Sequence, residues 1–279
     1  MSIILSISQN DNGTWAAGPE GLFLSTGNGL EQIPQPEAQL YCCCAIHDRV
    51  LVGGLPHGVA YSLRQAGDDW QAGWMDSVEA SVLTFAPDPE VEHSGVILAG
   101  TDGGGILRSG NRGQHWFTRN FGLETFTVLA IAWAPVAPAD QWPRWKYVFA
   151  TTEEGIYRSP NGGRGWKRAA CDEAVYQTLA VSPDFYSDGV VLAGTEDSGL
   201  YRSQDRGHTF TRVEGAPQQV NALAVTGEGW VLSDASGLWR STDSVTWTQV
   251  ADSKPALVLA TSAHGVLAGG EDGMSVLGD

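Results

Sequence analysis

Short apolar segments separated by turn-forming residues recur along the whole chain. The clearest example lies between residues 178 and 213, where TLAVS, VVLAG, GLYRS and TFTRV are separated by SPDFYSDG, TEDS and QDRG. Glycine, proline, aspartate and serine close tight turns because they adopt positive φ, fix φ or hydrogen-bond the backbone. Four short strands with a tight turn at each step predict one antiparallel meander.

The same pattern occurs in seven repeats, at approximately 3–33, 40–74, 81–121, 127–169, 176–213, 221–250 and 256–279. The mean period of about 40 residues is typical of a four-stranded propeller blade. The sequence therefore predicts one all-β domain over residues 1–279, a seven-bladed β-propeller. The last repeat lacks a fourth apolar segment, so we expect a three-stranded seventh blade and closure of the ring by packing of the first and last blades.

The first strand of each repeat carries a large residue followed by a small one. Aligned by hydrophobic pattern, the large row is Leu5, Cys43, Leu83, Leu129, Leu179, Leu223 and Leu259, and the small row is Ser6, Cys44, Thr84, Ala130, Ala180, Ala224 and Ala260. Adjacent strand residues point to opposite faces, so the two rows are expected on opposite sides of the innermost strand. In this alignment Cys43 and Cys44 fill core positions, where cysteine behaves as a small hydrophobic residue.

The turns between the third and fourth strands share a motif. SGNRGQHW, SPNGGRGW, SQDRGHTF and STDSVTW begin at residues 109, 159, 203 and 241. They resemble the Asp-box, S/T-x-D-x-G-x-x-W, and the chain is thereby similar to the sialidase-type BNR/Asp-box propellers, a superfamily that includes sortilin, xyloglucanase and photosystem II assembly-factor propellers. The resemblance implies a structural role for Asn111, Asn161, Asp205 and Asp243, whose side chains accept backbone N–H groups within the turn.

Sialidase activity is not expected, and no catalytic residue is assigned. The resemblance would require three arginines that bind the substrate carboxylate, a Tyr–Glu nucleophile pair and an aspartic acid. Many arginines instead belong to the repeat, and four occupy the position just before the box serine: Arg108, Arg158, Arg202 and Arg240. We expect this position to bond a neighbouring blade or an acid on the adjacent strand.

The net charge limits the classes of partner that the protein can bind, and the cysteine content indicates the cellular compartment. The net charge is −16, which argues against nucleic acid and against an anionic membrane, because both require clustered lysine and arginine. The N-terminus has no basic n-region, and no CxxC pair suggests zinc or a disulfide framework. Free thiols are typical of a reducing compartment, so we expect a cytoplasmic protein.

Acidic residues gather on the turns that follow the second strands, namely Glu20, Asp102, Glu153, Glu154, Glu196, Asp197, Asp234, Glu271 and Asp272. These turns and the connections between repeats share one face of a propeller, which we call the acidic face. The connections supply further acids, His57 falls on the same face, and Lys254 is the only base that the sequence places there. We therefore expect a strongly negative potential, unless the acids only form turns and aid solubility.

Three functions fit these features. The first is a non-catalytic protein-binding or assembly platform whose partner has a basic surface or segment; it requires no cofactor, although its carboxylates could hold Ca²⁺. The second is a glycosidase-like or metal-dependent hydrolase or lyase that uses carboxylates and His57 at the channel mouth. The third is a carbohydrate-binding propeller.

One insertion stands apart from the repeats. Residues 135–146, PVAPADQWPRWK, lie between the first two strands of the fourth repeat, on the face of the box turns. Trp142 and Trp145 are unusual in a loop. They either tuck under the propeller as a plug or form a docking site for a partner or a second copy.

Overall fold

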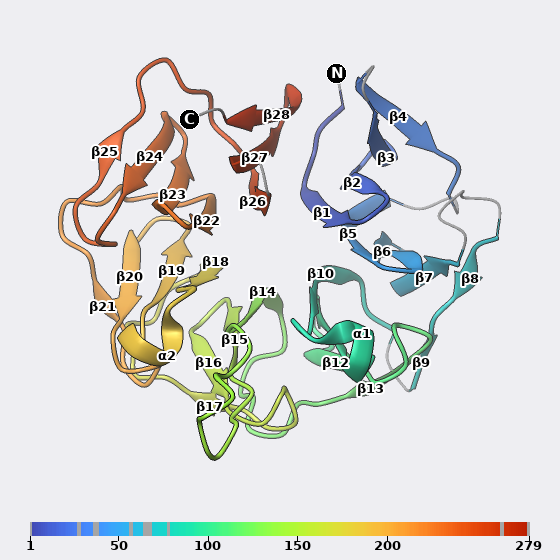
Figure 1. Cartoon of the computed structure of the whole chain (residues 1–279), viewed down its shortest axis with the longest axis horizontal. Coiled ribbons are helices and arrows are strands. Elements are labelled where there is room, and N and C mark those ends of the chain that lie inside the picture. Colours follow the sequence, from blue (N-terminus) through green and yellow to red (C-terminus); the bar gives the residue numbers. More distant parts are fainter. Residues whose placement is uncertain are drawn as a thin grey trace.

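The chain forms seven antiparallel sheets arranged as blades around a central channel (Figure 1). The computed structural model describes residues 2–26, 29–35, 39–55, 58–63, 69–76, 79–262 and 265–277. The predicted all-β, seven-bladed propeller is confirmed. Each blade runs from an innermost strand outwards, because consecutive strands pair in chain order.

The strands of the first four blades have these bounds. Blade 1 holds β1 Ser6–Asn10, β2 Gly13–Gly18, β3 Gly21–Thr26 and β4 Gly29–Ile33; blade 2 holds β5 Gln39–Ile46, β6 Arg49–Leu55, β7 Gly58–Ser62 and β8 Gln71–Ala72. Blade 3 holds β10 Val82–Pro87, β11 Ile97–Thr101, β12 Ile106–Ser109 and β13 His115–Thr118; blade 4 holds β14 Val128–Trp133, β15 Val148–Thr152, β16 Ile156–Ser159 and β17 Lys167–Arg168.

The last three blades follow the same order. Blade 5 holds β18 Tyr176–Val181, β19 Val191–Thr195, β20 Leu200–Ser203 and β21 Thr211–Arg212; blade 6 holds β22 Ala222–Thr226, β23 Gly229–Asp234, β24 Gly237–Ser241 and β25 Thr248–Gln249. Blade 7 holds β26 Val258–Ser262, β27 Gly265–Gly270 and β28 Gly273–Leu277. The predicted three-stranded last blade is confirmed.

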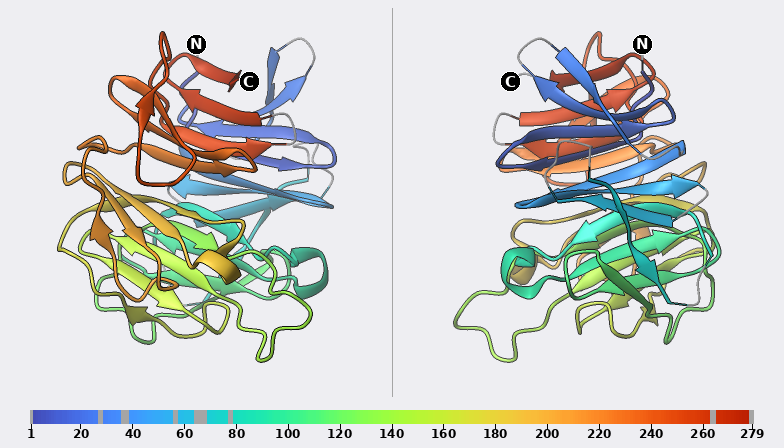
Figure 2. Two further views of the ribbon diagram at one scale, coloured as in Figure 1. Left: turned by 60° about the vertical axis from the view of Figure 1, so that its left-hand side comes forward. Right: turned by 90° about the vertical axis from the view of Figure 1, so that its right-hand side faces the viewer.

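Three short elements lie outside this scheme. Strand β9, Trp74–Met75, leaves blade 2 and pairs in parallel with β13 at the outer edge of blade 3. Helices α1, Val91–Ser94, and α2, Phe185–Asp188, lie in the connections between the first and second strands of blades 3 and 5. These connections share one face of the ring with the loop 135–146, which projects beyond the strands in Figure 2.

The inner strands of blades 2 to 5 each carry a β-bulge, at Tyr41, Leu83, Leu129 and Gln177. A bulge places two residues opposite one and reverses the side-chain alternation beyond it. Phe85 and Ile131, which pair with Ala99 and Ala150, therefore occupy the position that Leu179 occupies opposite Ala193.

The alignment of the large row was therefore wrong by two residues in blades 3 and 4. In blade 1 it was also wrong by two, since Ile7 and not Leu5 takes this position, opposite Ala16. Hydrophobic pattern alone could not reveal the shift, because a large apolar residue stands at both candidate positions in each of these blades.

The core is divided among the interfaces between neighbouring blades. Cys43 packs with Trp15 against blade 1, whereas Cys42 and Cys44 pack with Trp116 against blade 3. Burial raises the pKa of the Cys43 thiol to about 12 and raises those of Cys42 and Cys44 well above their usual value. The cysteine run thus consists of protonated core residues.

The first and last blades close the ring by packing against each other, as predicted. Strand β1 contacts both β26 and β27. Ile4 is fully buried between the two blades, and its backbone N–H donates to the carbonyl of Gly270 at 3.0 Å. A Cβ atom at Gly269 would lie 2.6 Å from the Ile4 side chain. Glycine is therefore required at this position for close approach.

Candidate functional site

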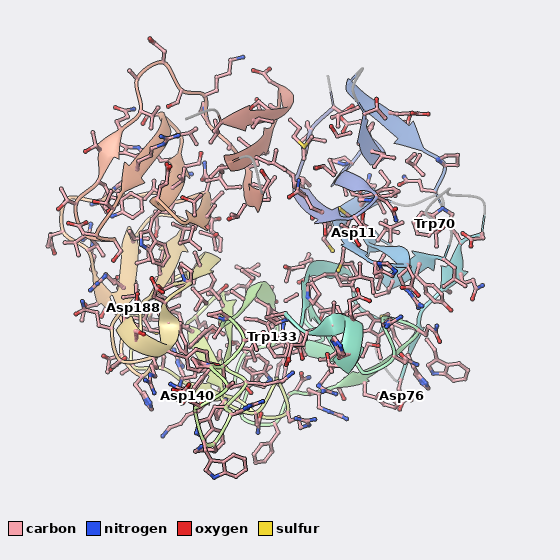
Figure 3. The ribbon with its side chains drawn as sticks, in the orientation of Figure 1. Asp11, Trp70, Asp76, Trp133, Asp140 and Asp188 are labelled. Atoms are coloured by element: carbon pink, nitrogen blue, oxygen red, sulfur yellow. The ribbon has the colours of Figure 1, made fainter. Side chains whose placement is uncertain are left out.

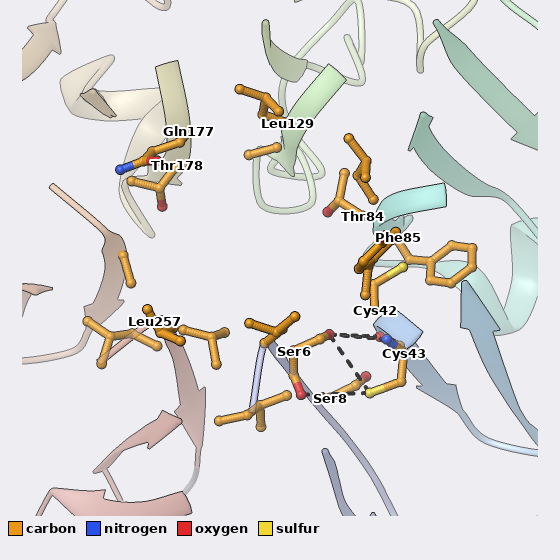
Figure 4. Close-up of a pocket in the computed structure, with 18 of the residues that line it drawn as sticks. Ser6, Ser8, Cys42, Cys43, Thr84, Phe85, Leu129, Gln177, Thr178 and Leu257 are labelled. Carbon is orange, nitrogen blue, oxygen red and sulfur yellow. Dashed lines mark hydrogen bonds between the residues drawn. The ribbon is translucent and has the colours of Figure 1, made fainter. Parts of the chain in front are cut away.

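All seven blades contribute residues to the wall of the central channel. It has a volume of about 340 Å³ and is lined by the inner strands, for example by Thr84, Thr178 and Leu257 (Figure 4). No aspartate, glutamate, histidine, lysine or arginine lines it within the described part of the chain. Its wall therefore supplies no carboxylate pair of the kind that glycoside hydrolysis requires.

The nine acids of the acidic face all lie on or beside turns between second and third strands. Eight are exposed and Asp234 is half-buried. His57, which the sequence pattern also predicts on this face, lies outside the described residues.

Several of these carboxylates stabilise local structure. Asp234 accepts backbone N–H bonds from Ser236 at 2.7 Å and Gly237 at 3.0 Å, and so closes its own turn. Glu20 accepts the backbone N–H of Ile3 at 3.1 Å, which fixes the segment that enters blade 1. Turn formation accounts for the residue type at Asp234, and the bond to the N-terminal segment accounts for it at Glu20.

Other carboxylates of this face have no such role. Glu153, Glu196 and Glu271 are exposed, and their side chains have no hydrogen-bond or ion-pair partner among the described residues. They lie on blades 4, 5 and 7. These side chains can meet a cationic partner without breaking an existing interaction.

The acidic face also holds more positive charge than the sequence indicates. Arg168 lies on outer strand β17, but its guanidinium donates to Glu124 Oε2 at 3.1 Å and to the Glu154 carbonyl at 2.9 Å. Lys254 pairs with Asp272 at 2.7 Å. The expectation that Lys254 is the only base on this face was wrong, because a long side chain can carry its charge across a blade edge.

The box turns lie on the opposite face, and their polar side chains bond within the turn. In blade 5, Asp205 Oδ1 accepts the Ser203 hydroxyl at 2.7 Å and the backbone N–H groups of His208 and Thr209 at 2.9 and 3.0 Å. Burial alone would raise the pKa of Asp205, but these bonds and one from the Thr209 hydroxyl lower it to about 2. The corresponding bonds are made by Asn111, Asn161 and Asp243.

In blades 3, 4 and 5, the arginine that precedes the box serine connects the blade to the next one. Arg108 Nε donates to the Gly162 carbonyl at 3.2 Å, Arg158 Nε to the Arg206 carbonyl at 2.8 Å, and Arg202 Nε to Ser244 Oγ at 2.7 Å. The three acceptors are the fourth residues of the next blade's box. Of the two expected roles, the bond to a neighbouring blade is the one observed.

Blade 2 makes an equivalent contact from a different position. Arg49 on β6 donates to the carbonyl of Arg112, the fourth box residue of blade 3, at 3.3 Å. Arg112, Gly162, Arg206 and Ser244 all have positive φ, between 57° and 72°. We call these four contacts the arginine latches. Three of the latches were indicated in the sequence by the arginine that recurs before the box serine, whereas the latch of Arg49 had no such signal.

The loop 135–146 projects from the box face. Trp142 is 91% exposed and Trp145 is 46% exposed, so the interpretation of both as a plug is wrong. The base of the loop is braced, because Lys146 pairs with the buried Asp88 at 2.8 Å and Tyr186 donates to the Trp145 carbonyl at 2.9 Å. Figure 3 shows Trp133, at the end of β14, nearer the channel than Asp140 in the loop.

Neither a metal-ion cluster nor a membrane-spanning helix is found within the described ranges. No group of three or more histidine, cysteine, aspartate or glutamate side chains is arranged to hold a metal ion within them. Within the same part of the chain, every helix is too short or too polar to cross a membrane.

The fold and its repeated latches define a seven-bladed β-propeller of antiparallel blades. Neither a family model nor a curated protein matches the sequence. Several solved structures do match. The extracellular domain of the one-component system BT4673 of B. thetaiotaomicron has a TM-score of 0.74 at 16% identity, over 98% of this chain and 38% of that chain. This chain thus spans well under half of that relative.

Two other solved propellers match over most of their own length. A structure of YCF48 bound to D1 peptide has a TM-score of 0.71 at 16% identity, over 98% of this chain and 92% of that chain. The WD40 β-propeller domain of Doa1 has a TM-score of 0.69 at 14% identity, over 98% of this chain and 91% of that chain. At these identities the likeness establishes the propeller fold alone.

Proposed function

We propose that this protein is a non-catalytic binding platform whose acidic face contacts a partner protein with a basic surface or segment. The observation that carries the proposal is the set of exposed carboxylates without partners at Glu153, Glu196 and Glu271. A propeller bound to a peptide, YCF48 with D1 peptide, is among the similar structures. The channel wall, without acids or bases in the described part, favours binding over the hydrolase alternative.

The experiment compares two triple variants with the same net charge. Glu153→Gln, Glu196→Gln and Asp197→Asn neutralise the acidic face, whereas Asp140→Asn, Asp184→Asn and Glu228→Gln neutralise the opposite face. Each tagged protein is purified from its native host, and co-purifying proteins are quantified by mass spectrometry.

We expect the acidic-face triple alone to lose basic partners, and we expect their recovery from wild-type protein to fall with added salt. Equal recovery by both triples would sink the proposal. The shared net charge ensures that a difference between them reports position and not total charge.

A further inference from the structure

The outer edge of blade 7 differs from the outer edges of the other blades. Its last described strand, β28, has the sequence GMSVL, without charge, proline or bulge. The outermost strands elsewhere are two residues long, as in β8, β9, β17, β21 and β25, or carry polar side chains, as in β4. Short length, charge and bulges are the usual protections of an exposed edge, and β28 has none of them.

The register of β28 identifies the backbone groups on this edge. Gly270 and Gly273 close a two-residue turn, so they form a hydrogen-bonded pair, and the bonded pairs continue at every second residue, at Ser275 and Leu277. The N–H and C=O groups of Met274 and Val276 therefore point away from β27. No partner for these four groups lies within the described residues.

Space and apolar surface accompany this edge. Two cavities lie between blades 6 and 7. One of about 860 Å³ lies beside β28 and the connection from blade 6, and the other, of about 660 Å³, lies at the opposite end of the space between these blades. Val276 is 58% exposed. In the four-stranded blades, the fourth strand covers the outer edge of the third.

The charges at the edge select one kind of occupant. Glu271 and Asp272 form the turn at the start of β28, Asp252 lines the adjacent cavity, and Lys254 offsets only one of these charges. A strand antiparallel to β28 places its C-terminal end beside this turn. A second copy of the chain carries the same charge of −16, which opposes self-association.

We propose that the edge of β28 docks an extended segment of the partner protein as a fourth strand of blade 7, antiparallel to β28. The segment has apolar residues at alternate positions and lysine or arginine at its C-terminal end, opposite Glu271. Main-chain bonds to Met274 and Val276 provide affinity, and the alternating side chains and the basic end provide specificity. This inference rests on the proposed function and specifies how the partner is held.

Two substitutions at Val276 test the outward edge of β28. Val276→Pro removes an outward N–H and leaves the β27 ladder intact, a position at which edge strands tolerate proline. Val276→Lys places a charge on the same edge, in case the proline variant fails to fold. The matched control is Gln249→Lys on β25, the outer edge of blade 6.

A random-peptide display library is selected against the wild-type protein, and the enriched peptides are measured by fluorescence anisotropy. We expect alternating apolar residues that end in lysine or arginine. Affinity should fall at least tenfold for Val276→Pro and Val276→Lys, several-fold for Glu271→Gln, and less than twofold for Gln249→Lys. Hydrogen exchange should show new protection at Met274 and Val276 when peptide binds.

Four results would overturn the inference: no peptide is enriched, peptides bind both Val276 variants as tightly as wild type, the two amides are already protected in the protein alone, or the wild type is a dimer that Val276→Lys dissociates. The last two would assign the edge to the chain itself or to a second copy. If the acidic-face triple loses the native partner and Val276→Pro keeps it, this inference fails and the proposed function stands. If the triple keeps the partner and Val276→Pro loses it, the acidic face is refuted as the contact surface and the docking edge stands.

Discussion

At the scale of single residues, the box turns require particular side chains, because backbone N–H groups within each turn need a side-chain oxygen as their acceptor. Asn161, Asp205 and Asp243 each accept two backbone N–H groups of their turn, and Asn111 accepts one. Asparagine and aspartate serve equally in this geometry, since both supply the acceptor oxygen. They differ in how the turn responds to acid.

The unfolding free energy should depend on Asp205 in a pH-dependent way. The folded pKa of about 2 lies below the unfolded value of about 3.9, so its stabilisation is complete above pH about 4 and is lost as the pH falls towards 2. We expect urea unfolding to show a difference between wild type and Asp205→Asn that shrinks over this range. Asn161→Ala is the control, because its effect should not titrate; a constant Asp205 difference would contradict the assignment.

Gly207 should be far less tolerant of substitution than Gly215, although both have positive φ, 78° and 81°. A Cβ at Gly207 would collide with Phe149 of the preceding blade, whereas nothing lies within 4 Å of one at Gly215. Gly215→Ala should cost about 1–2 kcal/mol of unfolding free energy, the cost of left-handed backbone. Gly207→Ala should cost at least about 1–3 kcal/mol more. Equal losses in chemical denaturation would show that the blade contact is unimportant.

At the scale of strands and turns, the arginine latches couple blades 2 to 6 to one another in sequence. The acceptor carbonyls face the preceding blade because the fourth box residue has positive φ. Arg158 also lies 4.8 Å from the centre of the Tyr147 ring, which adds a cation–π contact. The latches therefore combine an inter-blade bond with packing.

Arg158→Gln should lower the unfolding free energy by about 1–2 kcal/mol, since it removes a charged hydrogen bond and the ring contact. Arg164 provides the comparison, since within the described residues its guanidinium donates only to Asn161 of its own turn. Arg164→Gln should change stability by less than about 0.5 kcal/mol. Thermal and urea unfolding of both variants measure this. Matching effects would mean that the latch contributes no more than a surface arginine.

The element pattern was predictable to the extent that it depends on local chemistry. The number of blades, the short strands and the three-stranded last blade follow from the spacing of apolar segments and turn residues. The bulges at Leu83 and Leu129 were not predictable, because inserting one residue leaves the apolar pattern almost unchanged. The crossing of Arg168 to the acidic face was missed for a related reason, since strand position fixes a Cα atom but not the end of a long side chain.

At the scale of the whole molecule, the ring is held by contacts between neighbours and closed at one seam. The arginine latches join blades 2 to 6 in sequence. Blades 7 and 1 meet through the N-terminal segment, where Ile4 is fully buried and bonds Gly270. Stability in such a repeat array is a sum of local terms and nearest-neighbour interfaces.

Ile4→Ala should therefore loosen the seam before the rest of the ring. Loss of a fully buried isoleucine side chain costs about 2–5 kcal/mol, and hydrogen exchange should accelerate first at the amides of β1 and β27. The amides of β14, in blade 4, serve as the internal reference. Acceleration of equal size in all three strands would indicate that the ring opens as a single unit.

The β-bulge divides the ring into two arcs with different templates. Blades 2 to 5 have the extra inner-strand residue, and blades 6, 7 and 1 do not. Beyond the bulge the inner strands of both arcs have the same alternation, since Leu179 of blade 5 and Leu223 of blade 6 each pack against the preceding blade. The two arcs therefore differ by the one residue inserted at the start of the inner strand. Recombination or design that exchanges a blade across the boundary between the arcs must therefore add or remove one residue where the chain enters the inner strand, whereas an exchange within either arc leaves that length unchanged.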